Sequence, residues 1–178
     1  MPKKAGDAAK AGLRDRKGPL DYGRATVEAW LTNERVNQTL LDLLDPRIWD
    51  KFPPSSKRRN LATTFAHLHN VRCMRLKMSK AKVPARLDRA TVTIAEARQA
   101  LTESARAVAA LIEDSIFTGG HVRDYRPDVV ALVCSSINHE AHHRGQVCLW
   151  ARELGSPITP DQQFRLWGWD KHWRAATT

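Results

Sequence analysis

Apolar residues recur at three- and four-residue intervals along most of the chain, which is the pattern of helices with one buried face. Over residues 22–44 this spacing is sustained until Asp45 and Pro46 end it. A second helix is predicted over residues 57–79, after a loop in which two prolines remove amide donors. No segment shows a convincing alternation of the kind that predicts a strand.

A third helix has a clear start signal. Thr93 and Glu96 have the spacing of a capping box, in which each side chain accepts a hydrogen bond from a free amide at the helix start. The alanine-rich stretch that follows predicts a helix extending to about Phe117, where two glycines follow closely.

The fourth predicted helix covers residues 127–154. Pro127 and Asp128 mark its start, because proline is tolerated in a first helical turn and an acid is favoured near the positive end of the helix dipole. Gly155 marks its end. Four helices joined by short connections predict an all-α four-helix bundle.

The two ends of the chain differ from this body. Residues 1–18 form a basic arm rich in alanine, glycine and lysine, which we expect to be disordered, while residues 19–178 form the bundle domain. Residues 167–173 hold three of the six tryptophans, and this short segment is expected to plug one end of the bundle.

Composition narrows the setting. The 178 residues are 42% hydrophobic and 27% charged, as in one globular domain, and the three cysteines show no paired spacing. No run approaches the roughly 20 apolar residues that span a bilayer, and no apolar stretch follows the first basic residues as in a secretory signal. We therefore expect a cytoplasmic protein. The net charge of +10 favours acidic or phosphate-bearing partners where it is clustered.

Histidine is concentrated in two of the predicted helices. Five of the seven lie there, namely His67 and His69 in the second helix, and His139, His142 and His143 in the fourth. Residues four apart lie one above the other, so His139 and His143 can direct both imidazoles at one ion. His67 and His69 point to nearly opposite sides of their helix, so only one of them can join such a site.

The fourth helix invites a second interpretation, because His139 to His143 also matches the His-Glu-x-x-His pattern of metalloproteases. Glu140 lies about 100° off the stripe of the helix that begins at His139, which argues against it as a general base. An apolar seam runs along the face opposite the histidines: Val130, Cys134, Ile137, Ala141 and Cys148.

Two segments resemble a known family. Residues 138–147, Asn-His-Glu-Ala-His-His-Arg-Gly-Gln-Val, followed by Ala-Arg-Glu-Leu-Gly at 151–155, resemble the last-helix signature of DinB-like proteins, His-x-x-x-His-Arg-Gly-Gln. Residues 65–72, Phe-Ala-His-Leu-His-Asn-Val-Arg, resemble the segment that supplies the family's first histidine. The similarity extends over the four predicted helices and the Leu-Trp-Gly-Trp ending at 166–169.

The resemblance implies a four-helix bundle, commonly a homodimer, with a divalent metal bound by three histidines. Carried over by position, these are His67, His139 and His143. Zinc and nickel are the ions expected first, and iron also suits imidazole. Some relatives transfer a low-molecular-weight thiol, while many have no known reaction.

Three neutral imidazoles leave a coordination position open, as in catalytic zinc sites. The expected function is therefore a metal-dependent enzyme acting on a small molecule, which either hydrolyses its substrate through activated water or transfers a thiol to an electrophile. From the sequence, Gln146 either bonds a ligand at the site or faces solvent, and Arg144 either pairs within the fold or binds substrate.

Two other functions remain in view. A non-enzymatic nucleic-acid-binding protein would use the basic arm and the cluster at residues 57–59, but the chain shows no known DNA-reading motif. A metal-binding oligomerisation module without catalysis is the other, since the apolar seam leaves surface for a second copy.

Overall fold

The computed structural model describes residues 19–176, so the predicted basic arm lies outside the described residues. Its elements, in chain order, are α2 (Tyr22–Leu43), the 3-10 turn η1 (Pro46–Ile48), α3 (Leu61–Met78), α4 (Ile94–Phe117), β1 (His121–Val122), β2 (Tyr125–Asp128), α5 (Val129–Glu153), α6 (Pro160–Trp167) and α7 (Trp169–Ala176). The prediction of an all-α bundle is confirmed. Within the described part of the chain, no helix combines the length and the apolar character that crossing a bilayer requires.

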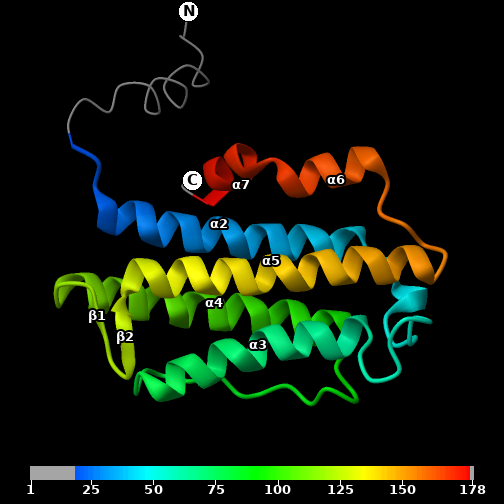
Figure 1. Cartoon of the computed structure of the whole chain (residues 1–178), viewed down its shortest axis with the longest axis horizontal. Helices are drawn as coiled ribbons and strands as arrows, with labels where there is room; N and C mark the ends of the chain where they lie inside the picture. The colour runs from blue at the N-terminus through cyan, green and yellow to red at the C-terminus, as the bar shows by residue number, and fades with distance from the viewer. Residues whose placement is uncertain (1–18, 177–178) are drawn as a thin grey trace, which may run out of the picture.

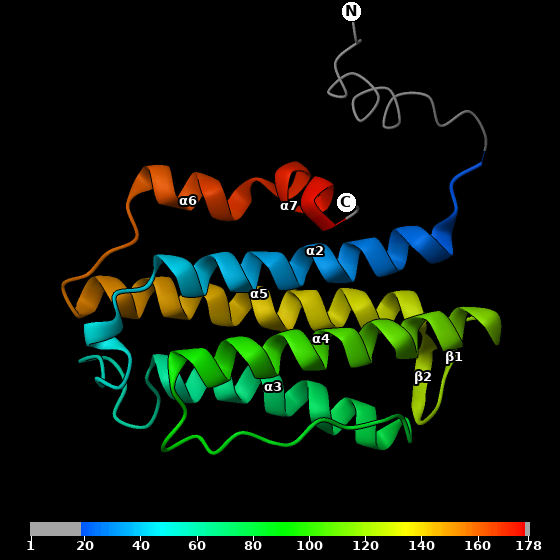
Figure 2. The same cartoon turned by 180° about the vertical axis from the view of Figure 1, so that it is seen from behind.

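The four long helices pack side by side, with α2 and α5 running in one direction and α3 and α4 in the other (Figure 1). Each of α2 and α3 contacts both α4 and α5. The segment 79–93 returns along the length of the bundle before α4 begins, which both views show (Figures 1 and 2). Because α3 and α5 run in opposite directions and contact each other, they are antiparallel neighbours.

Local capping explains where the helices begin. The capping box of Thr93 and Glu96 is present at the start of α4, as predicted. The second helix begins four residues later than predicted, because Asn60 is its N-cap and forms a capping box with Thr63. Both partners of that box are polar residues whose side chains satisfy free amides.

The start of α5 and the absence of strands were both predicted wrongly. Asp128 is the N-cap of α5 and accepts a hydrogen bond from the Ala131 amide (2.9 Å), but Pro127 belongs to β2. Strands β1 and β2 form a small antiparallel hairpin that the alternation rule does not detect, since β1 has only two residues. Gly119 and Gly120 open the hairpin with positive φ angles, a backbone conformation that favours glycine.

The core consists of two apolar clusters separated by a polar layer. The first cluster includes Leu61, Phe65 and Trp150, and the second includes Leu76 and Ile112. Along each long helix most of the buried polar residues fall between the two clusters. The main members of this polar layer are Asn33, Glu34 and Asn37 of α2, Arg72 of α3, Ser104 of α4 and Glu140 of α5.

The tryptophan-rich segment does not plug a bundle end. It folds into α6 and α7, which pack along the side of α2 (Figure 1). Trp167 is 78% exposed, while Trp173 donates a hydrogen bond to the Glu28 carboxylate (2.9 Å). The prediction that this segment closes a bundle end was wrong, because the loop after α5 turns the chain back alongside the bundle.

Candidate metal centre

Three histidines from two helices converge on the side of the bundle. His67 of α3 lies against His139 and His143 of α5, with ring centroids 5.3 Å and 4.8 Å away, respectively. The Nε2 atoms of His139 and His143 are 3.2 Å apart, and one ring nitrogen from each of the three histidines lies within 4.8 Å of the others. The structure thus brings together the three residues that the sequence selected.

The spacing of these nitrogens suits a small divalent ion. Nitrogens bound at 2.0–2.1 Å around a tetrahedral centre are about 3.3 Å apart, close to the separation of the His139 and His143 nitrogens. The His67 nitrogen needs only a short approach to complete the same geometry. All three donors are imidazoles, which suit zinc, nickel and iron.

Gln146 fixes the orientation of His143. Its side-chain oxygen lies 2.8 Å from Nδ1 of His143, so that nitrogen carries the proton and donates it. The lone pair of Nε2 is then left facing His139. The amide nitrogen of Gln146 lies 2.9 Å from Nε2 of the exposed His142 and donates to it. Gln146 therefore supports the site, and His142 lies outside the cluster of three.

Burial keeps the three imidazoles neutral. It lowers the pKa of His67 to about 4, with further contributions from the nearby His143 and Arg59. Burial is also the main cause that lowers the pKa of His139 and of His143. Neutral imidazole is the form that binds metals, so the site is in its ligand form at neutral pH.

His69 cannot reach this site. It is fully buried on the other side of α3, where its two ring nitrogens lie 2.8 Å from the carbonyl oxygens of Ala100 and Ala85. These contacts tie α3 to α4 and to the segment between them. Of the two α3 histidines, only His67 lies in the cluster with His139 and His143.

Glu140 occupies the polar layer rather than the site. Its carboxylate accepts hydrogen bonds from Arg72 (2.7 Å and 2.8 Å), Asn33 (2.6 Å) and Asn37 (2.7 Å). Burial alone would raise the pKa of Glu140, but the Arg72 charge and these hydrogen bonds hold it below its ordinary value. A carboxylate engaged in this way is not free to act as the base of a metalloprotease.

The polar layer also sets the rotation of α5. Arg72 pairs with Glu34 (2.8 Å) as well as Glu140, and Arg144 donates to the side-chain oxygens of Asn33 and Asn37 (2.8 Å each). Because Glu140 and Arg144 face α2 and α3 from inside the bundle, the histidine that precedes each of them faces the α3 surface. Arg144 is thus bonded within the fold.

Sequence reasoning missed this layer. Arg72 lies in segment 65–72 and Glu140 lies next to His139, yet neither spacing indicates that the two charged residues meet across 68 residues. The available signal was an arginine and a glutamate that each fall on an apolar face of a predicted helix. A charged residue in such a position usually needs a buried partner.

The open side of the site carries positive charge. A guanidinium nitrogen of Arg89, in the segment between α3 and α4, lies 3.3 Å from Nδ1 of His67. Arg59 lowers the pKa of all three histidines through its charge, and Arg75 does the same for His139. The site therefore combines neutral imidazoles with surrounding cations.

Three histidines from two neighbouring helices thus meet on the side of a helical bundle, and the chain is a helical protein with a group that could hold a metal ion. The model of the DinB family matches residues 19–170, so the chain belongs to the DinB family. The resemblance seen in the sequence is confirmed. Neither the curated proteins nor the solved structures gave a match.

Proposed function

We propose that the protein is a metal-dependent enzyme that acts on a small molecule, with His67, His139 and His143 as the ligands of a divalent ion. The observation that supports this most directly is the convergence of three neutral imidazoles within 4.8 Å. A divalent ion held in this way supplies a Lewis acid with at least one open coordination position, which can activate water or a thiol.

The residues of the chain prepare the site for this role. Burial keeps the imidazoles unprotonated, and the Gln146 oxygen holds the His143 ring with Nε2 towards its neighbours. The polar layer fixes the rotation of α5, so the two histidines of this helix need little reorganisation when an ion binds. The open side gives a substrate access from solvent.

Two reactions fit this site. In a thiol transfer, the sulfur forms a bond to an electrophilic carbon while that carbon loses its leaving group and the thiol proton passes to solvent. In a hydrolysis, water adds across the bond that breaks. Membership of the DinB family supports the first reaction, because some members use a low-molecular-weight thiol, and zinc and nickel are the ions proposed first.

Metal analysis of untagged protein tests the proposal. We expect a near-stoichiometric divalent ion in protein purified without chelator, and its loss in His67→Ala, His139→Ala and His143→Ala. His121→Ala is the matched control, because His121 is an exposed histidine of the hairpin. Wild-type protein that takes up no zinc, nickel or iron on direct titration would overturn the proposal.

A substrate screen separates the two reactions. Metal-loaded protein is incubated with a model electrophile in the presence and absence of small thiols, and with activated esters and amides. Thiol consumption that His143→Ala abolishes supports transfer, while ester or amide cleavage without thiol supports hydrolysis. Turnover that is equal in wild-type and His143→Ala protein would contradict both.

A further inference from the structure

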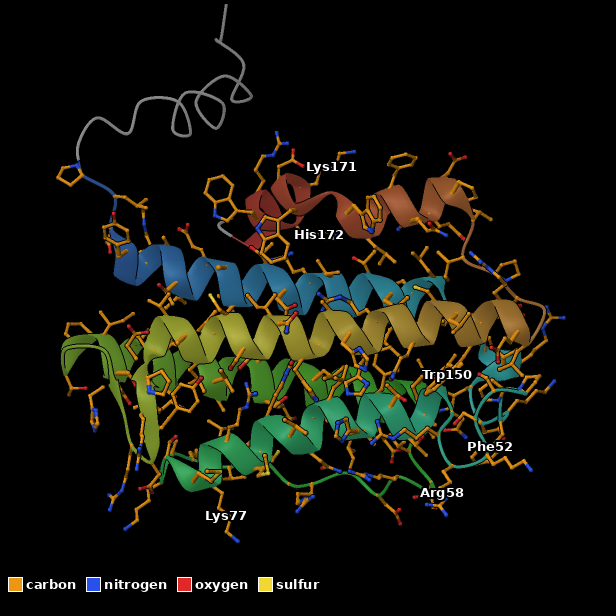
Figure 3. All side chains as sticks on the ribbon, in the orientation of Figure 1. Phe52, Arg58, Lys77, Trp150, Lys171 and His172 are labelled. Atoms are coloured by element: carbon orange, nitrogen blue, oxygen red, sulfur yellow. The ribbon has the colours of Figure 1, made fainter. Side chains whose placement is uncertain are left out.

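The positive charge of the chain is concentrated in the segment that contains His67. Residues 51–89 contain eleven lysines and arginines and a single acid, so this segment alone carries a net charge equal to the +10 of the whole chain. It comprises the loop before α3, α3 itself and most of the segment before α4. Arg58 and Lys77 point away from the bundle on this side (Figure 3).

Three arginines near the histidines have no carboxylate partner among the described residues. Arg89 makes its one side-chain contact with His67, and Arg59 is exposed. Arg75 is half-buried and bonds to the hydroxyl of Ser136. By contrast, Arg72 in the polar layer pairs with two acids. The cations around the site are therefore left available for an external anion.

A hollow of about 810 Å³ adjoins the histidines through Arg89, which lines it. Thr63 also lines the hollow and lies one helical turn before His67 on the same face of α3. Its walls include the aromatic residues Trp49 and Phe52. Phe52 is exposed in the loop at the end of the bundle where α3 begins (Figure 3). The volume is in the range of small-molecule sites.

Taking the proposed function as its basis, we propose that the substrate carries a carboxylate or phosphate group, which Arg89 binds beside the histidines, while its apolar part lies in the adjoining hollow. A guanidinium binds either anion through paired N–H donors. A divalent ion on three neutral imidazoles keeps its full double charge, so an anionic group is favoured there over a neutral one.

Arg89 is suited to change partners. A guanidinium has hydrogen-bond donors and no acceptor, so Arg89 donates to Nδ1 of the His67 ring. This hydrogen bond is weak, because it is 3.3 Å long and its acceptor is a neutral ring. A carboxylate or phosphate oxygen offers a charge-assisted bond that is stronger. Binding of an anion thus replaces a weak contact of Arg89 with a strong one.

The experiment uses the full chain loaded with zinc and three probes that share an aromatic ring: phenylphosphonate, phenylacetate and neutral 2-phenylethanol. Calorimetric titration is expected to show the two anions binding at least tenfold more tightly than the alcohol. Arg89→Gln should lower the affinity for both anions about tenfold or more, since it removes a hydrogen bond between charged groups. The tighter of the two anions identifies the group.

Arg86→Gln is the matched control, because Arg86 is an exposed arginine in the same segment and is not among the residues lining the hollow. It should leave the affinity for both anions within about twofold. Phe52→Ala should weaken the binding of both anions without changing the ratio of their affinities. Equal affinity for all three probes, or equal losses in Arg86→Gln and Arg89→Gln, would overturn the inference.

Two further outcomes are decisive. A DNA duplex that binds more tightly than either anion, with equal losses in Arg58→Gln and Arg89→Gln, would overturn the inference in favour of an extended nucleic-acid surface. Zinc content is measured in every sample. Retained zinc without anion preference defeats only this inference, whereas protein that takes up no zinc, nickel or iron defeats the proposed function whatever the anions do.

Discussion

Arg72 is the residue whose removal we expect to destabilise the fold most. It is buried between Glu34 and Glu140, and its guanidinium carbon lies 4.8 Å from the centre of the Trp30 ring. Arg72→Ala leaves two buried carboxylates without their cation. Breaking a buried ion pair in this way costs about 3–5 kcal/mol, or a fall in Tm on the order of 10 °C for a chain of this size.

Thermal and urea unfolding of the purified variant measure this effect. Lys77→Ala provides the comparison, because Lys77 is exposed on the same helix and its truncation should change the free energy of unfolding by less than about 0.5 kcal/mol. Equal stabilities of the two variants would show that the polar layer does not hold the bundle together.

Gln146 is a positioning residue for the proposed ion. Gln146→Ala removes the acceptor that fixes the protonated nitrogen of His143. We expect zinc affinity to fall by about 10–100-fold, the usual effect of losing a partner of a metal-bound histidine. His142→Ala should keep most of the affinity, because it leaves the Gln146 oxygen in place; competition with a zinc-binding dye measures both. A larger loss in His142→Ala would contradict this role.

At the residue scale, sequence reasoning selected the three histidines that lie together but missed the residues that support them. His139 and His143 could be paired because a helix places residues four apart together. The choice of His67 rested on family resemblance, since helix geometry alone showed only that His67 and His69 diverge. Arg72 and Glu140 were missed because long-range ion pairs leave no local pattern.

At the scale of the elements, the α3 and α5 pair has a pH dependence whose sign follows from the histidine pKa values. Burial lowers the pKa of His67 to about 4, and lowers those of His139 and His143 as well. The unfolded chain, with histidine pKa values near 6.5, binds protons that the folded chain does not. The contribution is fully present above about pH 6.5 and is lost as the pH falls towards 4.

Thermal unfolding of metal-free protein between pH 7.5 and 4.5 checks this dependence. We expect Tm to fall over that range, and to fall less steeply in His67→Gln, which lacks one of the three groups. His121→Gln should follow the wild-type curve. If Tm depends on pH equally steeply in His67→Gln and in wild-type protein, the pKa of His67 is the same in the folded and the unfolded chain.

Element boundaries were predictable where one side chain caps its own helix. Thr93 and Glu96 satisfy amides of the same turn, so their spacing alone located the start of α4. The helix start predicted at Pro127 was wrong because proline also suits an edge strand. Pro127 lies in a hairpin whose strands pair across a turn, and the local sequence does not show that pairing. The predicted start of the second helix at Lys57 was too early, because Asn60 is the N-cap of α3.

At the scale of the whole molecule, the apolar seam of α5 is left largely uncovered. Val130 is 48% exposed, and Cys134 and Ala141 are also exposed. The neighbouring Leu149 is 49% exposed. A row of apolar residues along one exposed helix face is typical of a symmetric contact between two copies. The homodimer predicted from the sequence therefore remains a prediction, with this seam as its proposed interface.

Sedimentation equilibrium checks the homodimer. We expect wild-type protein to behave as a dimer and Ala141→Glu to shift towards monomer, because it places a charge in the middle of the seam. Phe117→Lys changes another exposed apolar residue, at the end of α4, and should leave the mass unchanged. A wild-type monomer at high micromolar concentration would contradict the dimer.

The sequence alone determined that this chain forms a helical bundle, where α4 begins, and which helix faces carry imidazoles, because helix periodicity and capping depend on residues a few positions apart. Only the tertiary structure decided that α6 and α7 lie along α2, that the α5 seam faces outwards, and that Arg72 meets Glu140. These outcomes depend on how whole helices rotate against one another, and that rotation is set by contacts between residues far apart in the chain.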